Sequence, residues 1–141
     1  MNKSITIVII VLMTITTQSF YQQTPNQASY ENGNTVYTTY SMSCHMEDGN
    51  GLEGVFPSLV KTGNLADKNR MVKIILQGMR GKITVKETVY DAEMAAIAIS
   101  DKEVADVINY IRNSWGNKSP YLKEADVTAG KKAVVKDYQP F

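Results

Sequence analysis

The residues best suited to chemistry are Cys44 and His45, the one cysteine and the one histidine of this 141-residue chain. They are adjacent, and a glycine-rich stretch, 48–54, follows within a few residues. Thiolate and imidazole are strong ligands for transition metals, and both serve as nucleophiles or bases in catalysis. The chain therefore concentrates this chemistry at one point.

Counting donors narrows what the pair can do. A blue-copper site needs two histidines beside the cysteine, and a structural zinc site needs four donors, for which no spaced second pair is present. A cysteine nucleophile needs an imidazole that the fold brings near, and neighbouring side chains rarely face each other. An inert buried thiol remains an alternative. Haem fits better, because it needs one strong imidazole ligand, a second axial ligand and an apolar crevice.

Residues 1–19 have the pattern of a secretory signal. Lys3 supplies one positive charge, residues 5–15 form an apolar run broken only by threonines, and residues 17–19 offer a small-x-small cleavage pattern. We expect their removal on export to the periplasm. A retained N-terminal membrane anchor is the alternative, because the uncharged stretch is at the short edge of what spans a bilayer. In an exported chain a lone cysteine must be buried, intermolecular or covalently committed.

The remainder is predicted to be one domain with flexible ends. Residues 20–31 are polar and predict a flexible leader, 32–117 the folded domain, and 118–141 a tail. Without Lys3 the chain carries 14 basic and 14 acidic side chains, and the near-zero charge argues against a nucleic-acid partner. The scattered lysines receive no role, since solvated faces explain them.

Apolar spacing predicts a mainly α-helical fold of three to five helices. A first helix is expected over about 34–43, with Val36 and Tyr40 on one face. The glycine-rich stretch 45–64 predicts a functional loop. Apolar residues spaced i, i+3, i+4, i+7 and i+8 from Met71 to Met79 predict a helix that stops near Gly81.

The C-terminal half carries the most definite helix signal. Ser100 and Glu103 form a capping box, and an apolar stripe then runs to Trp115 before Gly116 closes the helix. A further short helix is expected over about 128–136. Residues 82–89 alternate briefly and predict an extended connector rather than a strand.

The segment Ser41-Met-Ser-Cys44-His45 resembles the Cys-x-x-Cys-His attachment motif of class I c-type cytochromes, with serine at the first cysteine position. Other spacings support the resemblance. Gly33 and Tyr37 match a glycine eight residues, and an aromatic residue four residues, before that position. The stretch 107–110 resembles the aliphatic-x-x-aromatic signature of the last helix. The resemblance implies a small cytochrome c fold packed around one haem.

The resemblance also implies a set of site residues. His45 would ligate the iron, with the carbonyl of Pro57, twelve residues on, accepting the imidazole Nδ1–H. Met94, in the loop before the final helix, would be the second axial ligand, and Met79 is the fallback. Cys44 would form one thioether to the haem. The chain departs from the family at Met46, where glycine is preferred, and at the residue after Met94, where proline is usual.

These residues together predict an exported mono-haem cytochrome c that passes single electrons between redox proteins, with no enzymatic turnover and no small-molecule substrate. A membrane complex is a possible assembly. Two alternatives stay open. Serine at position 41 could signal lost haem attachment and a structural subunit of a respiratory or oxidoreductase complex. A sixth position left open by Met94 could instead bind small ligands.

Overall fold

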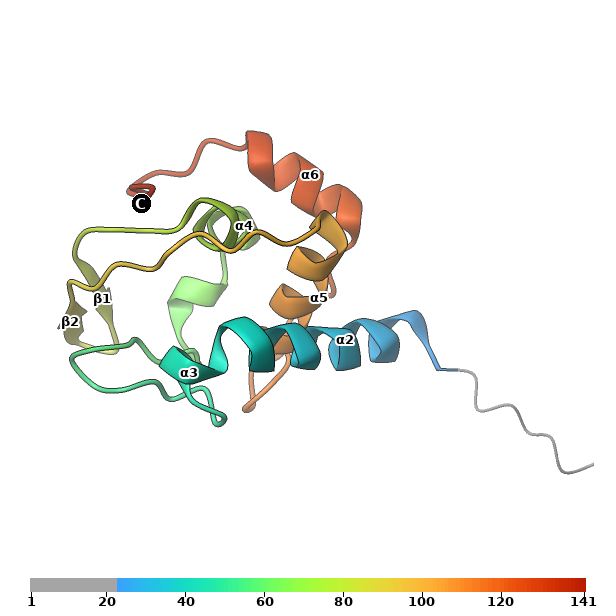
Figure 1. Ribbon diagram of the computed structural model, residues 1–141, viewed down its shortest axis with the longest axis horizontal. Helices are drawn as coiled ribbons and strands as arrows, with labels where there is room; N and C mark the ends of the chain where they lie inside the picture. The colour runs from blue at the N-terminus through green and yellow to red at the C-terminus, as the bar shows by residue number, and fades with distance from the viewer. Residues whose placement is uncertain (1–22) are drawn as a thin grey trace, which may run out of the picture.

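Five helices and one short hairpin form the part of the chain that the computed structural model describes, residues 23–141 (Figure 1). The helices are α2 (Pro25–Tyr40), α3 (Met42–His45), α4 (Lys68–Gln77), α5 (Asp101–Ile111) and α6 (Glu124–Lys132). A 3-10 turn, η1 (Gly63–Leu65), and two antiparallel strands, β1 (Ile83–Val85) and β2 (Thr88–Tyr90), complete the elements. The fold is mainly α-helical, as predicted. Within this part of the chain no helix has the length and apolar character of a membrane span.

Helix α2 begins earlier than the sequence pattern predicts, and the flexible leader proposed for 20–31 is wrong from Pro25 onward. The hydroxyl of Thr24 caps the first turn, and Pro25 occupies the first helical position, where its missing N–H costs nothing. Ser29 then donates to a carboxylate oxygen of Asp106 at 2.6 Å. A polar contact to α5 therefore holds this segment in place. Such a contact leaves no hydrophobic periodicity in the sequence from which the helix could be predicted. The proposed signal, 1–19, lies outside the described residues.

Helices α4 and α5 form as predicted but end earlier. Gly78, at φ 68°, stops α4, so Met79 lies beyond the helix and not on its face. The capping box of Ser100 and Glu103 is present at the start of α5. Helix α5 ends at Ile111, and the chain then turns through left-handed backbone at Trp115, φ 51°, and Gly116, φ 80°.

Two elements differ from the sequence-based expectation. The predicted connector 82–89 is the β1–β2 hairpin, whose two-residue turn places Lys86 and Glu87 at φ 49° and 72° without glycine or asparagine. Helix α6 covers Glu124–Lys132 in place of 128–136. It starts early because the carboxylate of Asp126 accepts the N–H of Lys123 at 2.9 Å and caps the first turn.

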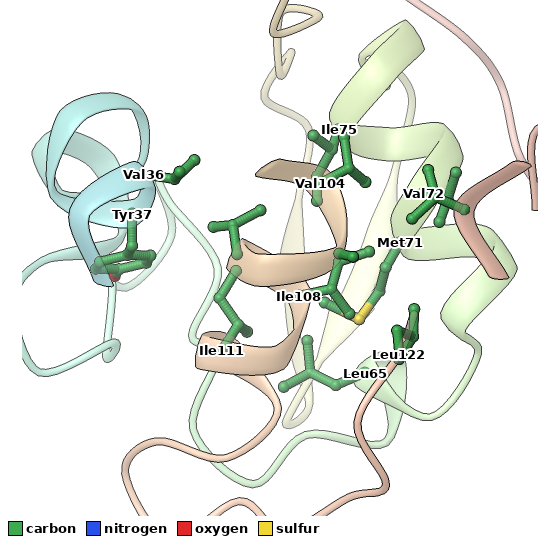
Figure 2. Close-up of a cluster of buried hydrophobic side chains, with 13 residues drawn as sticks. Val36, Tyr37, Leu65, Met71, Val72, Ile75, Val104, Ile108, Ile111 and Leu122 are labelled. Carbon is green, nitrogen blue, oxygen red and sulfur yellow. The ribbon is translucent and has the colours of Figure 1, made fainter. Parts of the chain in front are cut away.

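Helix α5 lies at the centre of the core, between α2 and α4 (Figure 2). Val104 and Ile108 on α5 are fully buried and share the core with Val36 of α2 and Val72 of α4. Val36 and Tyr40 lie four residues apart in α2, as predicted, but only Val36 is buried, because Tyr40 is 49% exposed. The buried face of α2 instead comprises Gly33, Val36 and Tyr37.

Gly33→Ala tests how closely α2 and α5 approach. A Cβ at Gly33 would lie 2.0 Å from the carbonyl oxygen of Asp106 and 2.8 Å from the Cβ of Tyr110. We expect the free energy of unfolding to fall by about 2 kcal/mol, measured by urea denaturation. Alanine favours the helix over glycine by about 1 kcal/mol, so a net fall in the free energy of unfolding must come from the clash of the new methyl group with α5. Gly63→Ala, with no atom within 4 Å of the new Cβ, is the control and should change little. Equal stability of the two variants would contradict this account.

Candidate haem site

A cavity of about 860 Å³, including its open mouth, lies against α2, α4, α5 and the β1–β2 hairpin. Fourteen of its twenty lining residues are apolar, among them Leu59, Ile75, Val107 and Ile111. His45, Pro57 and Met94 all line it, so the fold brings these three predicted site residues to one cavity.

His45 ends the four-residue helix α3, and its ring orientation is fixed by one backbone group. Its Nδ1 lies 2.9 Å from the carbonyl oxygen of Pro57, which is the contact that the resemblance implied. Because a carbonyl only accepts, Nδ1 carries the proton and Nε2 has the free lone pair. Burial lowers the pKa of His45, against a smaller opposite effect of the Pro57 carbonyl. The imidazole is therefore neutral at pH 7 and able to bind a metal through Nε2.

Cys44 and Ser41 lie on either side of a single helical turn. Ser41 is buried and lines the cavity, so the position of the missing first cysteine faces the expected site. Cys44 is a free, partly exposed thiol whose Sγ lies 3.9 Å from the hydroxyl oxygen of Ser43. It is not itself among the cavity-lining residues, although Ser41 and His45 on both sides of it are.

Met94 and Met79 lie side by side at the cavity wall. Their backbones form an isolated antiparallel bridge, with both N–H···O=C bonds at 2.8 Å. Met79 is buried, as a core residue would be, but it lies beyond the end of α4 at Gln77 and not on the helix face, and it lines the cavity with Met94. A thioether sulfur from either residue is a suitable soft ligand for iron.

Arg70 also lines the cavity, and the sequence analysis missed it. One Nη of its guanidinium donates to the carbonyl of Asp137 at 2.9 Å, and the other lies 3.8 Å from the sulfur of Met79. Arg70 thereby fastens the C-terminal tail beside the methionine pair. Its spacing of four residues from Ile74, another lining residue, was the available signal, because residues at i and i+4 share a helix face.

The donor set and the walls fit haem. One neutral imidazole has a free Nε2, two thioether sulfurs reach the same cavity, and the lining is largely apolar, as a haem crevice requires. Within residues 23–141 no cluster of three or more His, Cys, Asp or Glu side chains could hold a bare metal ion.

Fold and cavity together define a small, mainly α-helical domain built around one apolar cofactor cavity. Residues 30–115 match the cytochrome c family, and the chain belongs to that family. The family indicates an electron carrier rather than an enzyme, and it implies haem c as cofactor.

Curated relatives include both a separate cytochrome and subunits of larger enzymes. Cytochrome c-552 of Thermus thermophilus is 33% identical over 82 residues, which cover 52% of this chain and 61% of the relative. The cytochrome c subunit of the quinone alcohol dehydrogenase of Gluconacetobacter polyoxogenes is 33% identical over 109 residues, 73% of this chain and 23% of the relative. The gluconate 2-dehydrogenase cytochrome c subunit of Pantoea cypripedii is 31% identical over 104 residues, which cover 70% of this chain and 22% of the relative. The chain thus spans less than two thirds of each relative.

Tyr37→Phe tests the bond that holds the backbone after His45. The hydroxyl of Tyr37 donates to the carbonyl of Met46 at 2.6 Å, and Met46 has φ 63° and ψ 164°, a region nearly restricted to glycine. Removing the hydroxyl leaves that carbonyl with only the longer bond from the Gly49 N–H, at 3.2 Å. We expect the free energy of unfolding to fall by about 1–2 kcal/mol.

Tyr40→Phe is the matched control, because Tyr40 is 49% exposed. It should change the free energy of unfolding by less than about 0.5 kcal/mol in the same denaturation measurement. An equal fall in the free energy of unfolding for Tyr37→Phe and Tyr40→Phe would show that the hydrogen bond to the Met46 carbonyl does not stabilise the fold.

Proposed function

We propose that this chain is an exported mono-haem cytochrome c that carries single electrons between redox proteins. The observation that carries the proposal is the apolar cavity, lined both by an imidazole with a fixed tautomer and by methionine sulfur. Bound haem supplies an iron that changes between the ferric and ferrous states by one electron. The remaining roles belong to side chains of the protein.

His45 Nε2 and the sulfur of Met94 are the proposed axial ligands. The Pro57 carbonyl holds the imidazole ring in place, which keeps Nε2 directed for coordination and increases its basicity. Met94 is preferred over Met79 because its resemblance to the family's ligand loop adds to its place in the cavity. A thioether ligand would favour the ferrous form of a bound haem, and the apolar walls of the cavity would exclude water from it.

Cys44 is proposed to hold the haem by one thioether, since Ser41 cannot form the second. Ser41 faces the cavity in the place of the first attachment cysteine, and Cys44 lies three residues later, directly before the histidine. Pro57 acts through His45 and does not touch the iron.

The partners are proposed to be redox proteins that donate and accept electrons, with no small-molecule substrate. Two of the relatives carry names of dehydrogenase cytochrome subunits, which supports assembly with an oxidoreductase, and cytochrome c-552 supports a separate carrier. Residues 1–19 are proposed to direct the chain to the periplasm and to be removed there.

Intact mass and a reduced pyridine-haemochrome spectrum test attachment and processing together. We expect the mass of residues 20–141 plus one haem, with an α-band between those of haem b and of haem with two thioethers. Cys44→Ser should lose covalent haem, Ser43→Ala should keep it, and Ser41→Cys should shift the α-band toward the doubly attached form. An unmodified mass and no haem absorption in the exported protein would overturn the proposal in favour of a structural subunit.

The ligand assignment is tested by Met94→Leu against Met79→Leu. Met94→Leu should lower the reduction potential by on the order of 100 mV and allow carbon monoxide to bind the reduced protein. Met79→Leu should leave both properties nearly unchanged. The reverse pattern would make Met79 the ligand, and carbon monoxide binding to the unmodified protein would favour a small-ligand-binding haem protein.

A further inference from the structure

Arg112 is the most unusual charged side chain outside the cavity. It is only 8% exposed, and among residues 23–141 its Nε is the buried side-chain nitrogen that has no hydrogen-bond partner. The ion pairs of this region join other residues, and none reaches Arg112. Burial lowers the pKa of its guanidinium. A buried charge without a counterion is costly, so binding of an anion beside Arg112 would be favourable.

Arg112 lines a second, shallow hollow, of about 570 Å³ including its opening to solvent, between the segment 61–66 and the turn 116–119. Lys61 and Lys118 line the same hollow, and none of its lining residues is acidic. Three cations around one concave surface raise the local potential and attract anions. The hydroxyls of Thr62 and Ser119 also line it, and the described residues supply no hydrogen bond to either hydroxyl oxygen.

Asn117 fixes the two walls of this hollow relative to each other. Its Oδ1 accepts the backbone N–H of Lys61 at 2.7 Å, and its Nδ2 donates to the carbonyls of Leu59 and Ile111 at 2.9 Å and 2.8 Å. The side chain of Lys61 then passes over Gly116, where a Cβ would lie 2.7 Å from its Cε. The cationic walls are therefore held in place by the fold and do not depend on a ligand.

We propose that Arg112, Lys61 and Lys118 form a binding site for a small soluble oxyanion of the phosphate class. The guanidinium offers its N–H groups in a planar fork that matches two oxygens of such an anion. The lysines add charge, and the two hydroxyls are free to donate. The site is separate from haem attachment and stands whether or not Cys44 carries a cofactor.

Titration of the mature protein, as purified, with inorganic phosphate tests the site. The phosphate replaces chloride at constant ionic strength and pH, and the signals are followed by ¹H–¹⁵N NMR. We expect saturable shifts of the Arg112 Nε–H and of the backbone amides of Lys61 and Ser119. Lys118→Gln should raise the Kd by about two- to fivefold, and Arg112→Met by about tenfold.

Lys132→Gln is the matched control, since it removes the same charge from an exposed position on α6. It should leave the Kd unchanged. If Arg112→Met fails to fold, the Kd values of Lys118→Gln and Lys132→Gln still test the proposed site. Equal Kd values for these two variants, unsaturable shifts spread over all lysines, or an Arg112 Nε–H that is insensitive to phosphate would each overturn the proposal.

Discussion

The close crossing of α2 and α5 at Gly33 is the constraint on which the rest of the structure depends. The helix backbones approach so closely that a Cβ at Gly33 would lie 2.0 Å from the carbonyl oxygen of Asp106. Tyr37, Tyr110 and Trp115 then pack around the crossing with ring centroids 5.2–5.6 Å apart. Aromatic pairs at such distances avoid face-to-face stacking, and here the two pairs of Tyr37 are tilted while Tyr110 and Trp115 meet edge to face. A larger residue at position 33 would separate the helices and the aromatic cluster together.

The crossing matters for the site because both helices lead directly into it. Helix α2 continues through Ser41 into α3 and His45, whereas α5 supplies Val107 and Ile111 to the cavity wall. The turn after α5 reaches back to the attachment segment, since the indole N–H of Trp115 donates to the carbonyl of Glu47 at 3.1 Å. A shift of α5 against α2 would therefore move the imidazole and the apolar wall relative to each other.

Sequence reasoning found the parts of the site that are local in the chain. The twelve-residue spacing from His45 to Pro57 led to a contact that the structure contains, because the intervening loop folds back on itself. The capping box of α5 could also be predicted from the sequence, since Ser100 and Glu103 lie within one helical turn. The cavity was implied only through the family resemblance, as its walls come from segments far apart in sequence.

What the sequence did not disclose depends on long-range polar contacts. The start of α2 is ordered by Ser29 and Asp106, 77 residues apart, and composition alone made that segment look flexible. The sequence did not predict that Arg70 joins the C-terminal tail to Met79, because the groups that accept its hydrogen bonds in the tail are backbone carbonyls. Backbone acceptors leave no trace in the sequence, so such contacts are visible only in the folded structure.

Serine at position 41 changes how much the fold itself must contribute to holding a cofactor. Two thioethers would anchor a haem whatever the condition of the cavity, whereas the single thioether proposed at Cys44 would leave its orientation to the other residues that hold the iron and to the walls. The orientation of His45 depends on the Pro57 carbonyl, and the wall that α5 supplies depends on the crossing at Gly33. A substitution that loosens the crossing should therefore reduce retention of a correctly ligated haem as well as the free energy of unfolding. In a relative with two attachment cysteines the same substitution would alter stability while the haem stayed bound.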